Sequence, residues 1–205
     1  MNIKTVTKSV KKDIRCIACI LCIASLLTGC SLLPDISDSN TVENTEYVTV
    51  GNHLTVHNID SRLTLLNNMD ALSADGLYYA SWTSGDSEPY ENSDGDTVDL
   101  YDAQLYLLLG EFKTSDAALE NMDSWLAAGQ TNYDVTDEQT VTYNEQTYTV
   151  ITYNSTNEEN PYSHGISAFG VYNNLAVCVE LTCREDYRED LSDVLSVFLN
   201  NCTYN

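Results

Sequence analysis

Basic side chains are scarce in this chain of 205 residues. Nine Lys and Arg stand against 31 Asp and Glu, which gives a formal net charge of −22. Five of the nine bases but one of the acids lie in residues 1–29, so the remainder carries 4 − 30 = −26. Proteins that bind nucleic acids draw affinity from clustered Lys and Arg. The composition therefore predicts that no nucleic acid is a partner.

Residues and motifs typical of catalytic sites are also few. There are three histidines. His53 and His57 have a zinc spacing only on a helix, whereas their strand-like context puts them about 13 Å apart. The chain has no Gly-x-Ser-x-Gly, Walker-type or dinucleotide-binding motif. We therefore predict a non-catalytic protein, with a cell-wall or glycan-acting enzyme that uses a carboxylate pair as one alternative.

Long apolar runs are absent apart from Cys16–Leu27. This run is shorter than the roughly 20 residues that a membrane-spanning helix needs, but it fits a signal peptide. It follows a basic start and ends in Leu27-Thr28-Gly29-Cys30, which resembles the lipobox of bacterial lipoproteins. The resemblance implies that residues 1–29 are a signal peptide and that Cys30 carries a diacylglycerol.

A lipid on Cys30 would make the membrane a partner. The expected location is the extracytoplasmic face of the cell membrane, and the Asn-, Asp- and Tyr-rich composition favours a Gram-positive host. Residues 30–46 are polar and lack periodicity, which predicts a flexible tether. Residues 47–205 then form a single domain.

Within that domain, alternation and turn residues predict a series of hairpins. Gly51-Asn52 suggests a two-residue turn, and Asn173-Asn174 suggests another. The second turn would place Ile166 opposite Leu181, on a face that must be buried. The expected strands are 47–50, 53–56, 63–66, 76–82, 103–112, 140–143, 147–153, 166–172 and 175–183.

Two segments have helical periodicity. The first, Ser115–Ala128, has Thr114 or Ser115 as its cap and Gly129 as its expected stop. The second, Asp186–Asn200, has an apolar stripe that would cover the buried face of the last hairpin. These elements predict an α+β fold, an antiparallel sheet of hairpins covered by two principal helices.

The element order resembles the PsbP-like α/β/α sandwich, and a cystatin-like α+β fold is the alternative. The resemblance rests on the helix Ser115–Ala128, the hairpin Ile166–Cys183 and the helix Asp186–Asn200. Family members mostly act as binding or assembly factors without catalysis. The resemblance therefore implies a surface-tethered binding or assembly module, and it assigns no functional residue.

The candidate binding region is an acidic segment, 84–102, which its Gly, Ser and Asp content predicts to be a long loop. Its expected partner is a protein or a glycan. A calcium-dependent module is another alternative, because calcium favours clustered oxygen ligands; no other cofactor is expected. The candidate residues are Asp86, Glu88, Tyr90, Glu91, Asp94, Asp96, Asp99 and Tyr101.

Three cysteines follow Cys30: Cys178, Cys183 and Cys202. A disulfide between Cys178 and Cys202 is favoured over one between Cys183 and Cys202, because the rise of the last helix returns its end to the start of the last strand. The hairpin register, however, points Cys178 away from that helix. Three buried thiols are the alternative.

Overall fold

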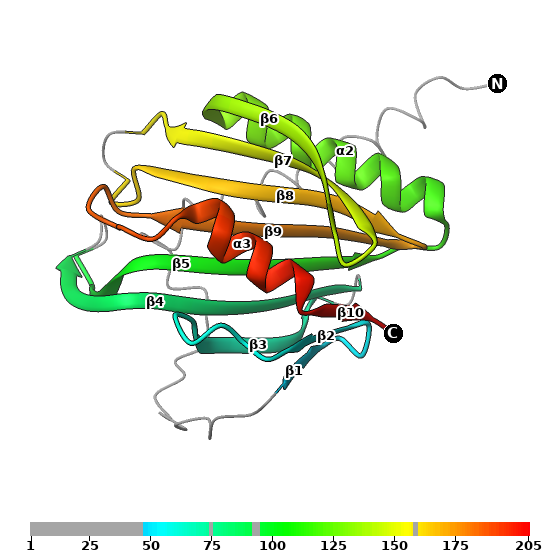
Figure 1. Ribbon diagram of the computed structural model, residues 1–205, viewed down its shortest axis with the longest axis horizontal. Coiled ribbons are helices and arrows are strands. Elements are labelled where there is room, and N and C mark those ends of the chain that lie inside the picture. The colour runs from blue at the N-terminus through cyan, green and yellow to red at the C-terminus, as the bar shows by residue number, and fades with distance from the viewer. Residues whose placement is uncertain (1–46, 74–75, 92–94, 158–159) are drawn as a thin grey trace.

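The computed structural model describes residues 47–73, 76–91, 95–157 and 160–205 (Figure 1). Cys30 and the predicted tether lie outside these ranges. Neither helix in the described part is long and apolar enough to cross a membrane. The elements in chain order are β1 (Tyr47–Val50), β2 (Leu54–His57), β3 (Thr64–Ser73), β4 (Leu77–Glu91), β5 (Thr97–Glu111), α2 (Ser115–Asn132), β6 (Tyr133–Tyr143), β7 (Gln146–Ser155), β8 (His164–Tyr172), β9 (Leu175–Cys183), α3 (Leu191–Asn200) and β10 (Cys202–Tyr204).

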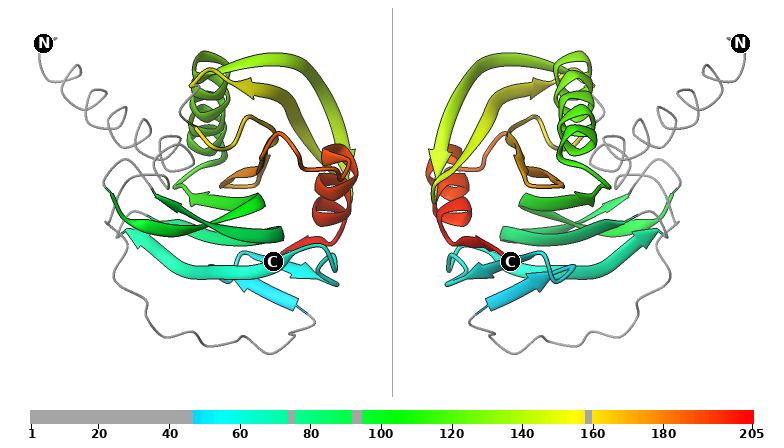
Figure 2. Two further views of the ribbon diagram at one scale, coloured as in Figure 1. Left: turned by 90° about the vertical axis from the view of Figure 1, so that its left-hand side faces the viewer. Right: turned by 90° about the vertical axis from the view of Figure 1, so that its right-hand side faces the viewer.

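Two antiparallel sheets organise these strands. The larger has seven strands in the order β3-β4-β5-β9-β8-β7-β6, and the smaller has the order β1-β2-β10. The small sheet and α3 pack on one face of the large sheet, and α2 packs on the other (Figures 1 and 2). The predicted α+β class, with hairpins covered by two principal helices, is confirmed.

The hairpin β8–β9 has the predicted register. Its turn is Asn173-Asn174, with Asn173 at a φ of 54°, and Ile166 pairs with Leu181. All nine residues of β9 are buried, because side chains of both its faces are covered. The strand therefore lies in the centre of the molecule, between β5 and β8.

The main core lies between α3 and the large sheet. Phe198 of α3 is 1% exposed, and its ring meets that of Trp82 edge-on, at a centroid distance of 5.0 Å. The face built by Ile166, Val179 and Leu181 contributes to the same cluster. The predicted covering of this face by the last helix is confirmed.

The last helix begins later than predicted. It starts at Leu191 rather than Asp186, because the side chain of Asp190 caps it by accepting a hydrogen bond from Asp193 N at 3.1 Å. A turn precedes the helix, with Tyr187 N donating to Arg184 O at 3.2 Å. The hydroxyl of Tyr187 is 3.0 Å from that of Ser84, so this turn still packs on the sheet.

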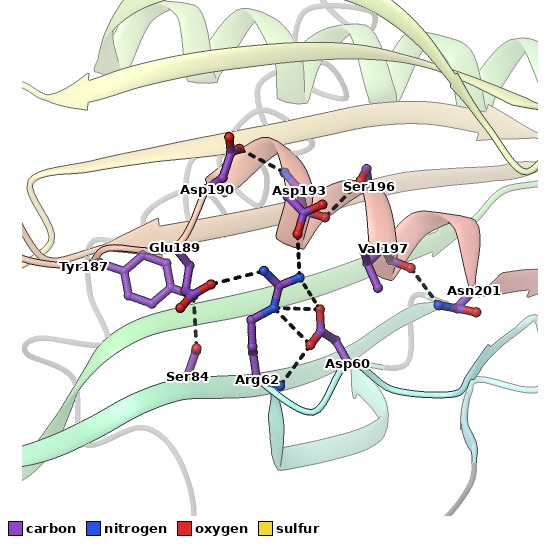
Figure 3. Close-up of polar contacts among 10 residues, drawn as sticks. All are labelled: Asp60, Arg62, Ser84, Tyr187, Glu189, Asp190, Asp193, Ser196, Val197 and Asn201. Carbon is purple, nitrogen blue, oxygen red and sulfur yellow. Dashed lines mark hydrogen bonds and ion pairs between the residues drawn. The ribbon is translucent and has the colours of Figure 1, made fainter.

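Arg62 ties the segment before β3 to the start of α3 (Figure 3). Its Nε donates to Asp60 Oδ2 at 2.9 Å. Its Nη2 lies 2.9 Å from Asp193 Oδ2, and its Nη1 lies 3.3 Å from Glu189 Oε2. The hydrogen bond with Arg62 lowers the pKa of Asp60. One of the few cations thus holds three carboxylates from two distant segments.

The helix α2 does not end at Gly129, as predicted, but continues to Asn132. Gly129 lies on the buried side of the helix, where a Cβ would meet Ile151 Cδ1 at 3.3 Å and Phe169 Cζ at 3.6 Å. The lack of a side chain therefore serves close packing of the helix on the sheet. The predicted cap is confirmed, since Thr114 Oγ1 accepts from Ala117 N at 3.2 Å.

The first hairpin turns over three residues rather than the predicted two. Val50 pairs with Leu54, so the loop consists of Gly51, Asn52 and His53. Gly51 has a φ of 59°, and an added Cβ there would overlap the ring of Tyr78. Both observations explain why glycine occupies this position.

We predict that Phe198→Ala lowers the free energy of unfolding by about 3–5 kcal/mol, because it leaves a cavity against Trp82. Denaturant titration measures this loss. The control is Ser192→Ala on the exposed side of α3, which should change stability by no more than about 0.5 kcal/mol. Equal, small losses in both variants would show that α3 does not close the main core.

Candidate functional site

Within the acidic segment 84–102, residues 84–91 and 97–102 form a strand pair rather than the predicted loop. Strands β4 and β5 continue into it, and the pairs run from Ser87 with Tyr101 to Glu91 with Thr97. Pairing of β4 with β3 stops at Thr83, and pairing of β5 with β9 stops at Ala103. Residues 84–91 and 97–102, here called the arm, therefore extend beyond the sheet as two strands.

A bulge marks the base of the arm. The register between β4 and β5 shifts between Ser84 and Ser87, and Gly85 has a φ of 79°. The backbone N–H of Asp86 donates to Asp102 Oδ2 at 2.9 Å. An added Cβ on Gly85 would overlap the Asp102 carboxylate, so glycine is required for this turn of the chain.

Arg184 fixes the arm to the end of β9. Its Nη1 lies 2.7 Å from Glu88 Oε1 and 3.8 Å from Asp102 Oδ1. Its backbone N–H donates to Asp102 O at 2.9 Å, and its Nε lies 3.6 Å from Asp186 Oδ1. A single cation and a main-chain bond therefore hold the base of the arm.

The predicted binding residues in the arm are divided between its two faces and do not gather on one of them. By the strand register, Glu88 shares a face with Leu100, and Asp99 lies opposite Pro89 on the other face. Tyr90 and Tyr101 are half-buried. Among the described residues, no group of three or more His, Cys, Asp or Glu is placed to hold a metal ion. Asp94 lies outside the described residues; those that are exposed are Asp86, Glu88, Glu91, Asp96 and Asp99.

A second polar site, which the sequence analysis missed, surrounds Glu180 in the middle of β9. Glu180 is 5% exposed. The hydroxyl of Tyr153 donates to its Oε1 at 2.6 Å, and that of Ser167 does so at 3.3 Å. Tyr133 stacks on Tyr153 at 3.9 Å, with the rings 8° apart. The available signal was that Glu180 is the one charged residue in the apolar strand Leu175–Cys183.

Gly165 allows this arrangement. It pairs with Tyr153 across β7 and β8, and an added Cβ would overlap the Tyr153 hydroxyl. The tyrosine can therefore lie across β8 and reach the carboxylate on β9. Burial raises the pKa of Glu180, although hydrogen bonds from Tyr153 and Tyr133 oppose the shift.

The face of the large sheet that contains Glu180 has two halves. The half around Glu180 and Thr182 is polar, and the half beneath α2 is apolar. Tyr106 lies directly beside Glu180, and Gln104 lies beside Thr182. Thr182 Oγ1 is buried, and no hydrogen-bond partner for it occurs in the part of the chain that the structure describes. The apolar half is lined by Leu108, Ile151, Phe169, Ala176 and Cys178. Glu180 lies at the boundary between the two halves.

The predicted disulfide between Cys178 and Cys202 is wrong. Both thiols are free and buried, and Cys183 is free as well. Cys178 packs on the α2 side of the large sheet, whereas Cys202 packs in the core beneath α3. The sheet itself separates them, as the hairpin register indicated. Burial raises the pKa of both thiols, which keeps them protonated and unreactive.

No family model matches this chain, and no curated protein does. Among solved structures, it is similar to cyanobacterial PsbP (CyanoP) from Synechocystis sp. PCC 6803, with 12% identity and a TM-score of 0.37 over 71% of this chain and 94% of that one. It is also similar to the extracellular domain of PknH from Mycobacterium tuberculosis, with 17% identity and a TM-score of 0.34 over 62% and 66% of the two chains.

A third similar structure comes from Bacteroides thetaiotaomicron VPI-5482, with 8% identity and a TM-score of 0.35 over 77% of this chain and 47% of that one. One of the three is a PsbP, the family that the element order resembles. All three TM-scores are below 0.5.

We predict that Glu180→Gln raises the melting temperature at neutral pH. The folded-state pKa of Glu180 lies above its ordinary value of 4.5, so ionisation opposes folding. This destabilisation is absent below pH 4.5, grows as the pH rises through the folded-state pKa, and then levels off. The neutral amide avoids it, so the gain over wild type should shrink as the pH falls.

Thermal melts from about pH 4 to about pH 8 measure this difference. The matched control is Glu120→Gln, the same change at an exposed position of α2, which should change stability by no more than about 0.5 kcal/mol. A gain for Glu180→Gln that does not vary with pH would contradict a buried, titrating carboxylate.

Proposed function

We propose that this protein is a lipid-anchored binding or assembly module without catalytic activity, which acts at the extracytoplasmic face of the cell membrane. The anchor is a diacylglycerol on Cys30, supported by the lipobox-like Leu27-Thr28-Gly29-Cys30. Residues 30–46 are the tether, and the partner is a protein or a glycan outside the cytoplasm.

The arm is the proposed contact surface, and one observation carries this assignment. Beyond Thr83 and Ala103, β4 and β5 continue as a ribbon that no third strand of the described chain flanks. Such a ribbon contributes little to a core, and isolated two-stranded hairpins are only marginally stable. Its bulge and the ion pair of Arg184 with Glu88 nevertheless hold it in one position. A positioned, exposed ribbon suits recognition, because ordering is complete before a partner binds.

Crosslinking in cells tests the contact surface. A photoreactive amino acid at Asp99 on the arm should give a discrete adduct on the full chain, whereas the same amino acid at Asp123 on α2 should not. A protein partner would give a protease-sensitive adduct, and a glycan partner would give a protease-resistant one. Equal adducts at both positions, or none at Asp99, would remove the arm as the contact surface.

Arg184→Ala should speed amide exchange in residues 86–91 and 97–102 and lower the Asp99 adduct several-fold, because it frees the base of the arm. Arg188→Ala is the matched control, since Arg188 is exposed and forms none of the ion pairs with the arm. Both variants lose one positive charge. If both lower the adduct equally, net charge rather than arm position controls binding.

Cys30→Ala should abolish lipidation. Intact-mass spectrometry of the wild type should show a chain that begins at Cys30 with the mass of a diacylglycerol, and the variant should lack that mass. The wild type should also remain with membranes after a high-salt wash, while the variant should not. A wild-type chain without lipid would contradict the proposed anchor and leave the arm assignment intact.

A further inference from the structure

The outer edge of β6 is a second surface that a partner can use, and it does not depend on the function proposed for the arm. Strand β6 is the last strand of the large sheet and pairs with β7 on one side. Within the described chain, no strand pairs with its other side. Figure 2 shows β6 and β7 curving from α2 towards α3, with β6 outermost.

The turn at the tip fixes which backbone groups face outwards. Tyr143 pairs with Gln146 across Asn144 and Glu145, whose φ values of 44° and 65° fit a two-residue hairpin turn. In such a hairpin the residues next to the turn bond to each other, and hydrogen-bonded pairs then alternate along the ladder. The outward N–H and C=O groups therefore belong to Glu138, Thr140 and Thr142.

This edge is regular and fixed in place. The one register shift in β6 lies between Val135 and Asp137, so Glu138–Tyr143 pairs with β7 without interruption. The backbone N–H of Asn144 donates to Asn200 Oδ1 at 3.0 Å, and Asn144 Nδ2 donates to Cys202 O at 2.6 Å. The tip is thus attached to α3 and β10, which reduces the ordering cost of adding a strand.

The opposite edge of the sheet is different. Strand β3 has two register shifts, between Leu65 and Asn67 and between Met69 and Ser73. Such irregularities are a known means of preventing strand addition, as are Lys and Pro on an edge. Residues 138–143 contain neither residue and instead carry threonines, which favour strands.

The negative charge around β6 indicates that a strand added there should carry positive charge. Residues 114–183, which supply α2 and β6 to β9, contain no Lys or Arg. Asp134, Asp137 and Glu138 on β6 are exposed. The predicted tether, 31–46, is acidic and has no base, and a second copy of this chain would be equally acidic. Like charges on facing strands are unfavourable, whereas opposite charges stabilise the pair.

We propose that the β6 edge docks an extended segment of a partner protein that carries Lys or Arg, as an added strand along Glu138–Tyr143. The outward backbone groups of Glu138, Thr140 and Thr142 provide the hydrogen bonds. The exposed carboxylates of Asp137 and Glu138 select cationic side chains. This mode obtains affinity from the main chain and specificity from the flanking side chains.

A synthetic peptide of alternating Lys and Val tests the proposal on the full chain in detergent micelles. Bound peptide should slow amide exchange at Glu138, Thr140 and Thr142 and leave Asp99 on the arm unchanged. A peptide of alternating Glu and Val should give no protection. Protection without any peptide, together with a dimer in sedimentation, would overturn the proposal in favour of a second copy of this chain.

A pair of variants at Thr140 separates the contribution of the backbone N–H to peptide binding from that of the side chain. Thr140→Pro removes one outward N–H without removing a bond to β7, whereas Thr140→Ala keeps that N–H. We expect Thr140→Pro to weaken peptide binding about tenfold and Thr140→Ala to leave it nearly unchanged. Amide exchange in β9 checks that both variants fold. If Thr140→Pro does not fold, the protection pattern of the wild type decides.

The proposal is overturned if the Lys–Val peptide protects none of these three amides, or if the Glu–Val peptide protects them equally. It is also overturned if a folded Thr140→Pro variant binds as tightly as Thr140→Ala. Asp137→Asn combined with Glu138→Gln should weaken binding of the Lys–Val peptide and reduce its dependence on salt. Unchanged binding by this double variant would remove charge as the selecting feature.

Discussion

The burial of β9 on both faces is the constraint on which the other elements depend. One face of β9 is covered by α3 and the small sheet, and α2 covers the apolar half of its other face, so that every residue of the strand is buried. This arrangement separates Cys178 from Cys202 and excludes a disulfide between them. It also places Glu180 in a buried position, where desolvation of a carboxylate costs free energy unless hydrogen bonds compensate. Tyrosines from β6 and β7 surround it there. The position of one strand thus determines both cores and the burial of Glu180.

The scarcity of cations determines how the exposed segments are attached. After Cys30 the chain has four bases, and two of them hold several carboxylates each. Arg62 joins the segment before β3 to α3, and Arg184 joins the arm to the end of β9. Surface ion pairs contribute little to stability individually. Their effect here is to select one position for a segment that is otherwise held by few contacts.

The sequence predicts what is local and periodic. The β8–β9 register follows from the Asn173-Asn174 turn and from alternation, and the cap at Thr114 follows from residue type. The rest depends on contacts between distant residues. β10 was not predicted, because its three residues form a strand only by pairing with β2. Gly, Ser and Asp in the arm indicate a loop, and cross-strand pairing overrides this composition. Glu180 was visible as an isolated charge, but its partners come from other strands.

The two edges of the large sheet illustrate how acidity can permit one kind of association and oppose another. An unpaired regular strand is a risk for self-association, and β3 reduces that risk by its irregular register. The regular part of β6 has no such irregularity, and its protection against identical copies is the negative charge beside it. Charge differs from a bulge in one respect, since it repels acidic strands and attracts basic ones. On the proposed docking mode, an edge protected by carboxylates alone opposes pairing with copies of this chain and favours a cationic strand.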